Sequence, residues 1–162
     1  MKLLLILSLI SVVVARGATV GTLRCEFREN PEGIDVSEPR LSWIQASSER
    51  GARQKGWQVM VASSVAALAA EKADLWDSGK IDLDQSIHVS YAGKPLASRQ
   101  ACFWKVRIWD QEGKATAWSE VARWSVGLLD GDWQGKWIGK NTPEVKPPLT
   151  DASWIVSPGQ SA

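Results

Sequence analysis

The stretch from Cys102 to Ser119 constrains the fold more than any other part of the chain. Residues 102–109 (CFWKVRIW) alternate, with Cys102, Trp104, Val106 and Ile108 on one side of an extended chain. This period of two is expected of a strand with one buried face and one face at least half in water. Residues 110–113 (DQEG) then predict a turn, and the alternating run 122–126 predicts a returning strand. We expect this hairpin to be the centre of an antiparallel sandwich.

Further short strands are predicted on the N-terminal side of this hairpin. They cover residues 22–27, 39–44, 56–63 and 86–91, and the last of these should point Ile87, Val89 and Tyr91 inward. Residues 64–72 are rich in alanine, and either Ser63 or Ser64 can cap a short helix there. These short strands, separated by Gly, Pro and Asp turns within about 110 residues, predict an all-β, fibronectin type III-like or immunoglobulin-like sandwich. The antibody version is disfavoured because its Cys-Trp-Cys spacing is absent.

The N-terminus has the features of a secretory signal peptide. Lys2 is followed by the apolar run 3–14, and small residues surround a cleavage position after Ala15. The run is too short for a membrane span, which needs about 20 apolar residues. A buried N-terminal strand is the alternative, disfavoured because no turn residues bound the run. We therefore expect residues 1–15 to be a signal peptide and the protein to be exported, to the periplasm or beyond the cell.

The charge of the mature chain limits the classes of partner. Cleavage after Ala15 would remove Lys2, so the formal net charge of +1 would become zero. A neutral chain with no basic block gives no support for nucleic acid or an anionic membrane as a partner.

The chain holds ten tryptophans but only two phenylalanines and one tyrosine. Tryptophan suits both a thick sandwich core and the flat faces of sugars. We expect those on alternating strands to lie in the core, and we expect exposed ones, most plausibly Trp109 or Trp118, to be the candidates for sugar binding.

Two cysteines, Cys25 and Cys102, fall in different expected strands. Export permits a disulfide between them, but the sequence cannot place them within bridging range, so two buried free thiols is the preferred expectation. With a single histidine they cannot form a structural zinc site without carboxylates. No motif predicts a metal, a cofactor or a catalytic residue.

Candidate titratable groups are few. His88 could act as a general base, but without a nucleophile motif a solvated strand histidine is the better interpretation. Three acidic pairs could in principle cleave a glycoside or hold calcium, although all lie in expected turns, where Asp bonds its own backbone. The pairs are Asp74 and Asp77, Asp82 and Asp84, and Asp130 and Asp132.

Several phrases together resemble the N-terminal region of bacterial α-L-rhamnosidases of glycoside hydrolase family 78. In order along the chain they are NPEGID (30–35), PRLSW (39–43), Gln54, VASS (61–64), DLWDSGK (74–80), YAGKPL (91–96), WKVRIWD (104–110), WS (118–119), GLL (127–129) and WIG (137–139). The resemblance implies a fibronectin III-like module that opens a large exported enzyme. Such an enzyme continues with a jelly-roll-like domain, further β modules and an (α/α)6 barrel that hydrolyses terminal α-L-rhamnosides with inversion. None of the family's catalytic acids maps onto a residue of this chain.

These observations predict three parts: the signal peptide 1–15, the sandwich 20–129, and residues 130–162 as a linker and the truncated start of a second β domain. The last part is interrupted by Pro143, Pro147 and Pro148, and a segment of roughly 30 residues cannot bury a core of its own. The chain is thus expected to be a fragment, inactive alone. Its preferred role is a non-catalytic module of a rhamnosidase that contacts the enzyme's downstream domains. The alternatives are a module that binds rhamnose-containing glycans and a stand-alone adhesive module that binds protein.

Overall fold

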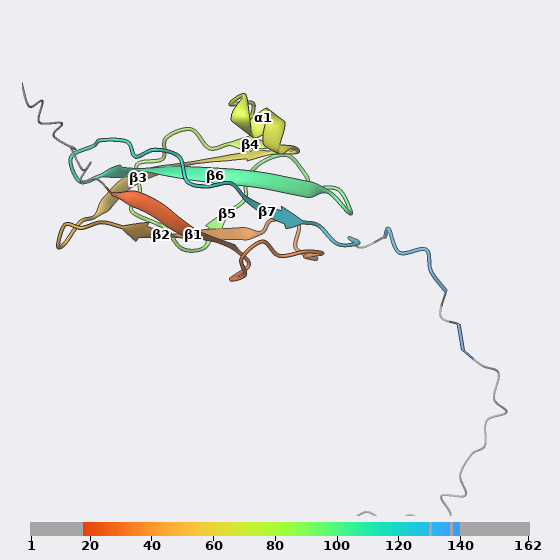
Figure 1. The fold of residues 1–162 in the computed structure, drawn as a ribbon. Coiled ribbons are helices and arrows are strands. Elements are labelled where there is room, and N and C mark those ends of the chain that lie inside the picture. The colour runs from red at the N-terminus through yellow and green to blue at the C-terminus, as the bar shows by residue number, and fades with distance from the viewer. Residues whose placement is uncertain (1–17, 130, 137, 140–162) are drawn as a thin grey trace, which may run out of the picture.

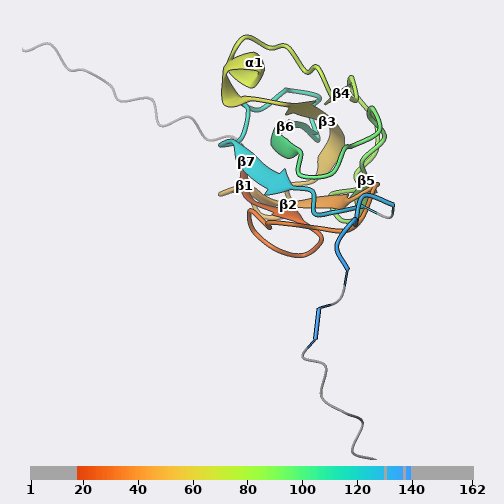
Figure 2. The ribbon, with the colours of Figure 1, turned by 90° about the vertical axis from the view of Figure 1, so that its right-hand side faces the viewer.

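The computed structural model describes residues 18–129, 131–136 and 138–139. The strands between residues 19 and 125 form two antiparallel sheets packed face to face (Figure 1). Figure 2 views the two layers from the side. The smaller sheet has the order β1 (Thr19–Cys25), β2 (Arg40–Ala46), β5 (Val89–Ser90). The larger has the order β4 (Trp76–Asp77), β3 (Gln54–Ala62), β6 (Ala101–Asp110), β7 (Ala122–Ser125), and the one short helix of the described residues is α1 (Val65–Ala69). The predicted all-β sandwich is confirmed.

Strand β6 is the centre of the larger sheet, as the alternation of residues 102–109 predicts. It pairs with β3 on one side, where Val59 faces Val106, and with β7 on the other, where Trp104 faces Ala122. The inward residues Trp104, Val106 and Ile108 are fully buried. The predicted turn forms at Gly113 with a positive φ of 81°, and its N–H donates to the carbonyl of Asp110 at 3.0 Å.

The core is dominated by aromatic rings that meet edge to face. Trp43 and Trp57 have ring centroids 5.7 Å apart, and Trp104 and Trp124 lie 6.4 Å apart. Tyr91 joins the second pair at 6.0 Å from Trp124. All five are buried, so the core interpretation is confirmed for these tryptophans, and large rings fill the space between the sheets.

Two details of the expected strands are wrong. Ile87 points outward and is 61% exposed, because His88 has a positive φ of 56° that ends the alternation and reduces β5 to two residues. The first strand ends at Cys25 rather than at Phe27, because Glu26 and Phe27 also adopt positive φ. A backbone in this region leaves the extended conformation, so neither segment continues as a strand.

Helix α1 lies on the outer face of the larger sheet (Figure 1). Ser64 caps it, since its hydroxyl accepts a hydrogen bond from the N–H of Ala67 at 3.1 Å. Leu68 is buried against Met60 and Ala62 of β3, and Lys105 of β6 donates to the Leu68 carbonyl at 3.0 Å. The helix therefore covers part of one outer sheet face.

Both cysteines are buried free thiols that face the same core. Burial raises the pKa of Cys25 to about 12, and the neighbouring Glu26 and Cys102 act in the same direction. Burial likewise raises the pKa of Cys102 to about 12. Neither thiol is reactive in the folded protein at neutral pH.

Other expectations fall beyond the described residues. The expected signal peptide 1–15 and residues 140–162 of the expected start of a second domain lie outside the part that the structure describes. Residues 131–136 and 138–139 contain no helix or strand. Among the described residues, no helix is long and apolar enough to cross a membrane.

Candidate functional site

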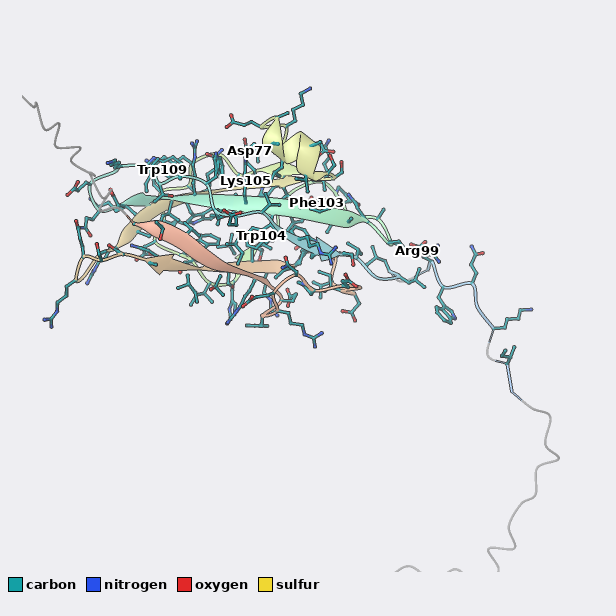
Figure 3. The ribbon with its side chains drawn as sticks, in the orientation of Figure 1. Asp77, Arg99, Phe103, Trp104, Lys105 and Trp109 are labelled. Atoms are coloured by element: carbon teal, nitrogen blue, oxygen red, sulfur yellow. The ribbon has the colours of Figure 1, made fainter. Side chains whose placement is uncertain are left out.

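The outer face of the larger sheet carries a stack of cations and aromatic rings, which we call the cation–aromatic stack. Its members are Lys80, Trp109, Arg107, Trp118 and Lys105. The alternation of β6 places three of them on one face, and Figure 3 shows Lys105 and Trp109 on the side opposite to Trp104. The loop after the 110–113 turn brings Trp118 back over β6, held by the bond from the N–H of Ser119 to the Val106 carbonyl at 2.8 Å.

Arg107 joins the two rings of the stack. Its guanidinium lies 5.1 Å from the centre of the Trp109 ring and 4.6 Å from that of Trp118. It also donates twice to Oε1 of Gln58, at 3.0 and 2.8 Å, and Gln58 in turn donates to Asp77 at 2.7 Å. The rings are held in place by groups of the same domain.

This geometry bears on the sugar-binding hypothesis for Trp109 and Trp118. Both rings are half-buried rather than exposed. Lys80 lies 5.4 Å from the Trp109 ring and Lys105 lies 4.8 Å from the Trp118 ring, in addition to Arg107. A sugar platform needs an open ring face, so the stack is better suited to sealing the sheet than to binding a glycan.

His88 lies on the outer face of the smaller sheet. It is exposed, and its ring meets the edge of Phe27 with centroids 5.0 Å apart. Its backbone N–H donates to the hydroxyl of Ser42 at 3.1 Å. The Ser42 hydroxyl thus bonds the backbone of His88 and not its imidazole, and the ring packs on Phe27, so both contacts are structural.

The acidic pairs mainly hold turns. Asp74 accepts hydrogen bonds from the backbone and hydroxyl of Ser63, at 2.9 and 2.6 Å, and these bonds lower the pKa of Asp74. Asp77 accepts from the N–H of Gly79 at 2.9 Å, and Asp82 pairs with Lys80 at 2.6 Å.

Of the third acidic pair, Asp130 and Asp132, the structure describes only Asp132. Asp132 accepts from the hydroxyl of Ser98, whereas Asp130 lies outside the described residues. Within the described ranges, no group of three or more Asp, Glu, His or Cys side chains could hold a metal ion.

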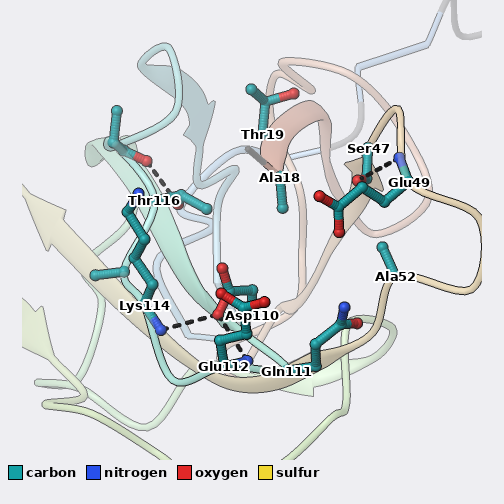
Figure 4. A pocket seen from close by; sticks show the side chains of 12 residues that line it. Ala18, Thr19, Ser47, Glu49, Ala52, Asp110, Gln111, Glu112, Lys114 and Thr116 are labelled. Carbon is teal, nitrogen blue, oxygen red and sulfur yellow. Dashed lines mark hydrogen bonds between the residues drawn. The ribbon is translucent and has the colours of Figure 1, made fainter. Parts of the chain in front are cut away.

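A pocket of about 300 Å³ opens at one end of the sandwich (Figure 4). Glu49, Asp110 and Glu112 line it beside Lys114. Asp110 is committed to its own turn, because its Oδ1 accepts the N–H groups of Glu112 at 3.0 Å and Lys114 at 2.8 Å. The pocket thus presents turn residues rather than an assembled acid–base pair.

A second hollow, which we call the outer groove, lies on the outer face of the smaller sheet and has a volume of about 410 Å³. Three of its walls are exposed apolar side chains: Phe27 at 59%, Ile44 at 52% and Ile87 at 61% exposure. Thr22 and Ser42 contribute hydroxyls. Our sequence analysis missed this groove, although the inward positions of Leu41 and Trp43 already imply that Ile44 points outward.

Two ion pairs involve residues that line the groove or contact its lining. Arg40 contacts both oxygens of Glu26, at 3.2 and 2.7 Å, and its guanidinium also lies 5.0 Å from the centre of the Phe27 ring. This side-chain hydrogen bonding is the main reason that the pKa of Glu26 is lowered. Arg24 approaches Glu29 at 3.8 Å. The charges beside the groove are therefore matched within the domain.

Comparison with known proteins gives a consistent set of relatives. The family model described as "Rha78A-like, N-terminal immunoglobulin domain" matches residues 20–130. An α-L-rhamnosidase of Streptomyces avermitilis is 45% identical over 135 residues, covering 82% of this chain and 13% of that protein. An α-L-rhamnosidase of Formosa agariphila is 44% identical over 117 residues, covering 72% of this chain and 12% of that protein. The chain thus spans only 12–13% of the length of these relatives.

Solved structures agree with these sequence relatives. The S. avermitilis α-L-rhamnosidase complexed with L-rhamnose superposes with a TM-score of 0.72 at 44% identity, over 76% of this chain and 12% of that one. The α-L-rhamnosidase of Dictyoglumus thermophilum also gives 0.72, at 35% identity, over 75% of this chain and 14% of that one.

Proposed function

Because the chain belongs to the family of Rha78A-like N-terminal immunoglobulin domains, we propose that it is the non-catalytic N-terminal module of an exported α-L-rhamnosidase. The observation that carries this proposal is the extended match to proteins named α-L-rhamnosidase, of which the shared region is only 12–13%. Most of such an enzyme lies outside this sandwich. The module's role is then to support the enzyme rather than to perform its chemistry.

The site geometry supports a non-catalytic role. An inverting glycosidase needs two carboxyl groups about 6.5–9.5 Å apart with room for a water molecule between them. In the described residues, each of three aspartates accepts a backbone N–H: Asp74 that of Ser63, Asp77 that of Gly79, and Asp110 that of Lys114. We therefore assign hydrolysis of terminal α-L-rhamnosides to a downstream part of the polypeptide, which the resemblance identifies as an (α/α)6 domain.

Export through the leader 1–15 is part of this proposal. It predicts that the mature polypeptide begins at Arg16, since cleavage after Ala15 removes the apolar run. N-terminal sequencing of the native protein tests this. A native protein that retains Met1 or Lys2 would overturn the export proposal and leave the module assignment standing.

The central experiment measures the native polypeptide and its activity together. An antibody against residues 22–128 detects the polypeptide, and the immunoprecipitate is assayed with an aryl α-L-rhamnoside beside the purified 162-residue chain. We expect a band several times longer than this chain that hydrolyses the substrate, and no turnover by the 162-residue chain. A native band of the size of this chain, or turnover by this chain alone, would overturn the proposal.

A further inference from the structure

We propose that the outer groove is the surface on which a neighbouring domain of the same polypeptide docks. This inference rests on the proposed function, because it requires further domains on the same chain. The groove lies on the outer face of β1 and β2. Figure 1 shows these two strands at the bottom, on the opposite side of the sandwich from α1. Four features of this face carry the proposal.

The first feature is the concentration of apolar side chains. Phe27, Ile44 and Ile87 are all more than half exposed, come from three separate segments, and line one groove. Apolar side chains scattered singly over a surface need no explanation, but several gathered in one hollow mark an interaction site. Burying them against a partner recovers roughly 25 cal/mol for each Å² of apolar surface removed from water.

The second feature is the backbone. Thr22, Phe27 and His88 all have positive φ, at 40°, 66° and 56°. Thr22 and Phe27 line the groove, and the His88 ring packs against Phe27. A β-branched residue such as Thr22 rarely adopts this conformation, and such strain persists only where the surrounding structure holds it in place and is concentrated at functional positions.

The structure holds one of these strained residues in a specific way. The N–H of His88 donates to the Ser42 hydroxyl at 3.1 Å, and the His88 carbonyl accepts from the Gln85 side chain at 3.1 Å. The adjacent Ile87 carbonyl accepts from the same Gln85 side chain at 3.0 Å. These bonds keep Ile87 turned outward at the groove, although the sequence alternation favours an inward position.

The third feature is the contrast with the other sheet. Within the described residues, the outer face of the larger sheet is already covered by α1 and by the cation–aromatic stack. Within the described residues no helix lies over β1 and β2 (Figure 1), and the cation–π contact on this side, between Arg40 and Phe27, leaves Phe27 59% exposed. The smaller sheet therefore still presents the exposed apolar side chains Phe27, Ile44 and Ile87 on its outer face.

The fourth feature is the match between this face and the surface of a domain. Interfaces between domains of one chain mix apolar and polar groups over roughly 600–1,500 Å². The charges beside the groove are paired internally, Glu26 with Arg40 and Arg24 with Glu29, so the partner surface need bring no compensating charge. We therefore expect a mainly apolar partner surface with hydrogen-bonding groups for the Thr22 and Ser42 hydroxyls.

The length of the relatives identifies the source of this partner. The matched region is 12–13% of each curated relative, so most of such a polypeptide lies beyond the sandwich and is tethered to it. A tethered domain binds at a high effective concentration, so a modest groove is enough to hold it. A sugar is a poorer fit, since the guanidinium of Arg40 already lies over the Phe27 ring.

Thiol labelling tests the inference directly. The variant Ile44→Cys places a thiol in the groove, and Val65→Cys on α1, which is 50% exposed in the native protein, is the matched control. The native thiols Cys25 and Cys102 are buried and contribute little background. Each variant is made in the 162-residue chain and in the full native polypeptide, and the rate of maleimide labelling is measured for each.

We expect both variants to react at similar rates in the 162-residue chain. In the full polypeptide, labelling of Ile44→Cys should slow by roughly tenfold or more, because a thiol buried at an interface reacts only when the interface opens, while Val65→Cys keeps its rate. An unchanged rate at position 44, or equal slowing at both positions, would overturn the docking proposal and leave the proposed function standing.

Two further outcomes separate the alternatives. Slow labelling of Ile44→Cys that depends on the concentration of the 162-residue chain would assign the groove to a second copy of this chain and overturn the proposal. A native polypeptide no longer than this chain would overturn both the proposed function and the docking inference. The immunoblot described above decides that point before any labelling is done.

Discussion

The guanidinium of Arg107 lies 4.6 Å from the centre of the Trp118 ring, on the outer face of the larger sheet. Trp118 is eleven positions further along the chain, in the loop that returns over β6. The pair therefore fastens this loop to the sheet, and Arg107 extends the contact by donating to the buried Gln58. This places the tryptophans that were the best sugar-binding candidates in a structural role.

Arg107→Met is expected to destabilise the domain by about 1–2 kcal/mol, because it removes two cation–π contacts and the charged donors to Gln58. Urea unfolding followed by tryptophan fluorescence measures the change. The matched control is Arg123→Met on β7, whose partner Glu32 is mostly exposed. The control should leave the free energy of unfolding almost unchanged. An equal loss in both variants would show that the cation–aromatic stack adds no stability beyond that of an exposed ion pair.

The same variant separates the stack from a sugar site. If Trp109 and Trp118 only seal the sheet, the native chain should show no change in tryptophan fluorescence on titration with L-rhamnose. A saturable response that Arg107→Met alters and Arg123→Met does not would instead assign glycan binding to the stack.

The second prediction concerns Gln54, because its side chain accepts the hydrogen bond of a buried tryptophan in the core. Its Oε1 accepts from the indole N–H of Trp43 at 3.0 Å, and its side-chain N–H donates to the Gln85 carbonyl at 2.9 Å. Within the described residues, the buried indole N–H groups of Trp57, Trp104 and Trp124 have no such partner. The hydrogen bond from Trp43 to Gln54 thus distinguishes Trp43 from these three buried tryptophans.

Gln54→Leu should cost about 1–3 kcal/mol, since a buried donor and a carbonyl lose their partner. The comparison is Gln45→Leu near the end of β2, where the side chain is only half-buried, and for which we expect little change in the free energy of unfolding. Chemical denaturation of both variants decides the matter. A Gln54→Leu variant as stable as the native chain would mean that water replaces the lost bonds.

The sequence predicted the regular parts of this fold because they follow from local periodicity. Trp104 and Ile108 had to share a face of β6, and Ser64 was a suitable cap for α1. The outer groove could not be predicted, since it depends on positive φ at Thr22 and His88. Those conformations are set by distant contacts, such as that between the His88 N–H and the Ser42 hydroxyl, which are 46 positions apart. Local propensity carries no signal for a contact of that range.

The third prediction concerns Gly93, where close packing of the neighbouring residues leaves no room for a side chain. A Cβ at this position would lie 2.5 Å from both the Cβ of Trp76 and the hydroxyl of Tyr91, and 2.6 Å from the Leu75 carbonyl. Gly93→Ala should therefore destabilise the domain by about 2–3 kcal/mol through overpacking. Gly21→Ala is the control, because no atom lies within 4 Å of its added Cβ. Thermal unfolding should show a large drop in Tm for the first variant only.

The buried thiols give the last prediction, a loss of stability in alkali. Burial raises the pKa of both Cys25 and Cys102 from 9.0 to about 12 and that of Tyr91 from 10.0 to about 12. Below pH 9 these groups are protonated whether the chain is folded or unfolded, so their contribution is fully present. Above pH 9 the unfolded thiols ionise first, and stability falls until the folded pKa is reached.

Cys102→Ala should make this fall shallower by about 1 kcal/mol per pH unit between pH 9.5 and 11, because most of one proton is no longer released on unfolding. Urea unfolding at a series of pH values from 8 to 11 measures the slope for the native chain and the variant. The small cavity left by the substitution shifts the whole curve down equally at every pH, so it cannot imitate a change of slope. Parallel curves for the two proteins would mean that the Cys102 thiol ionises as readily in the core as in the unfolded chain.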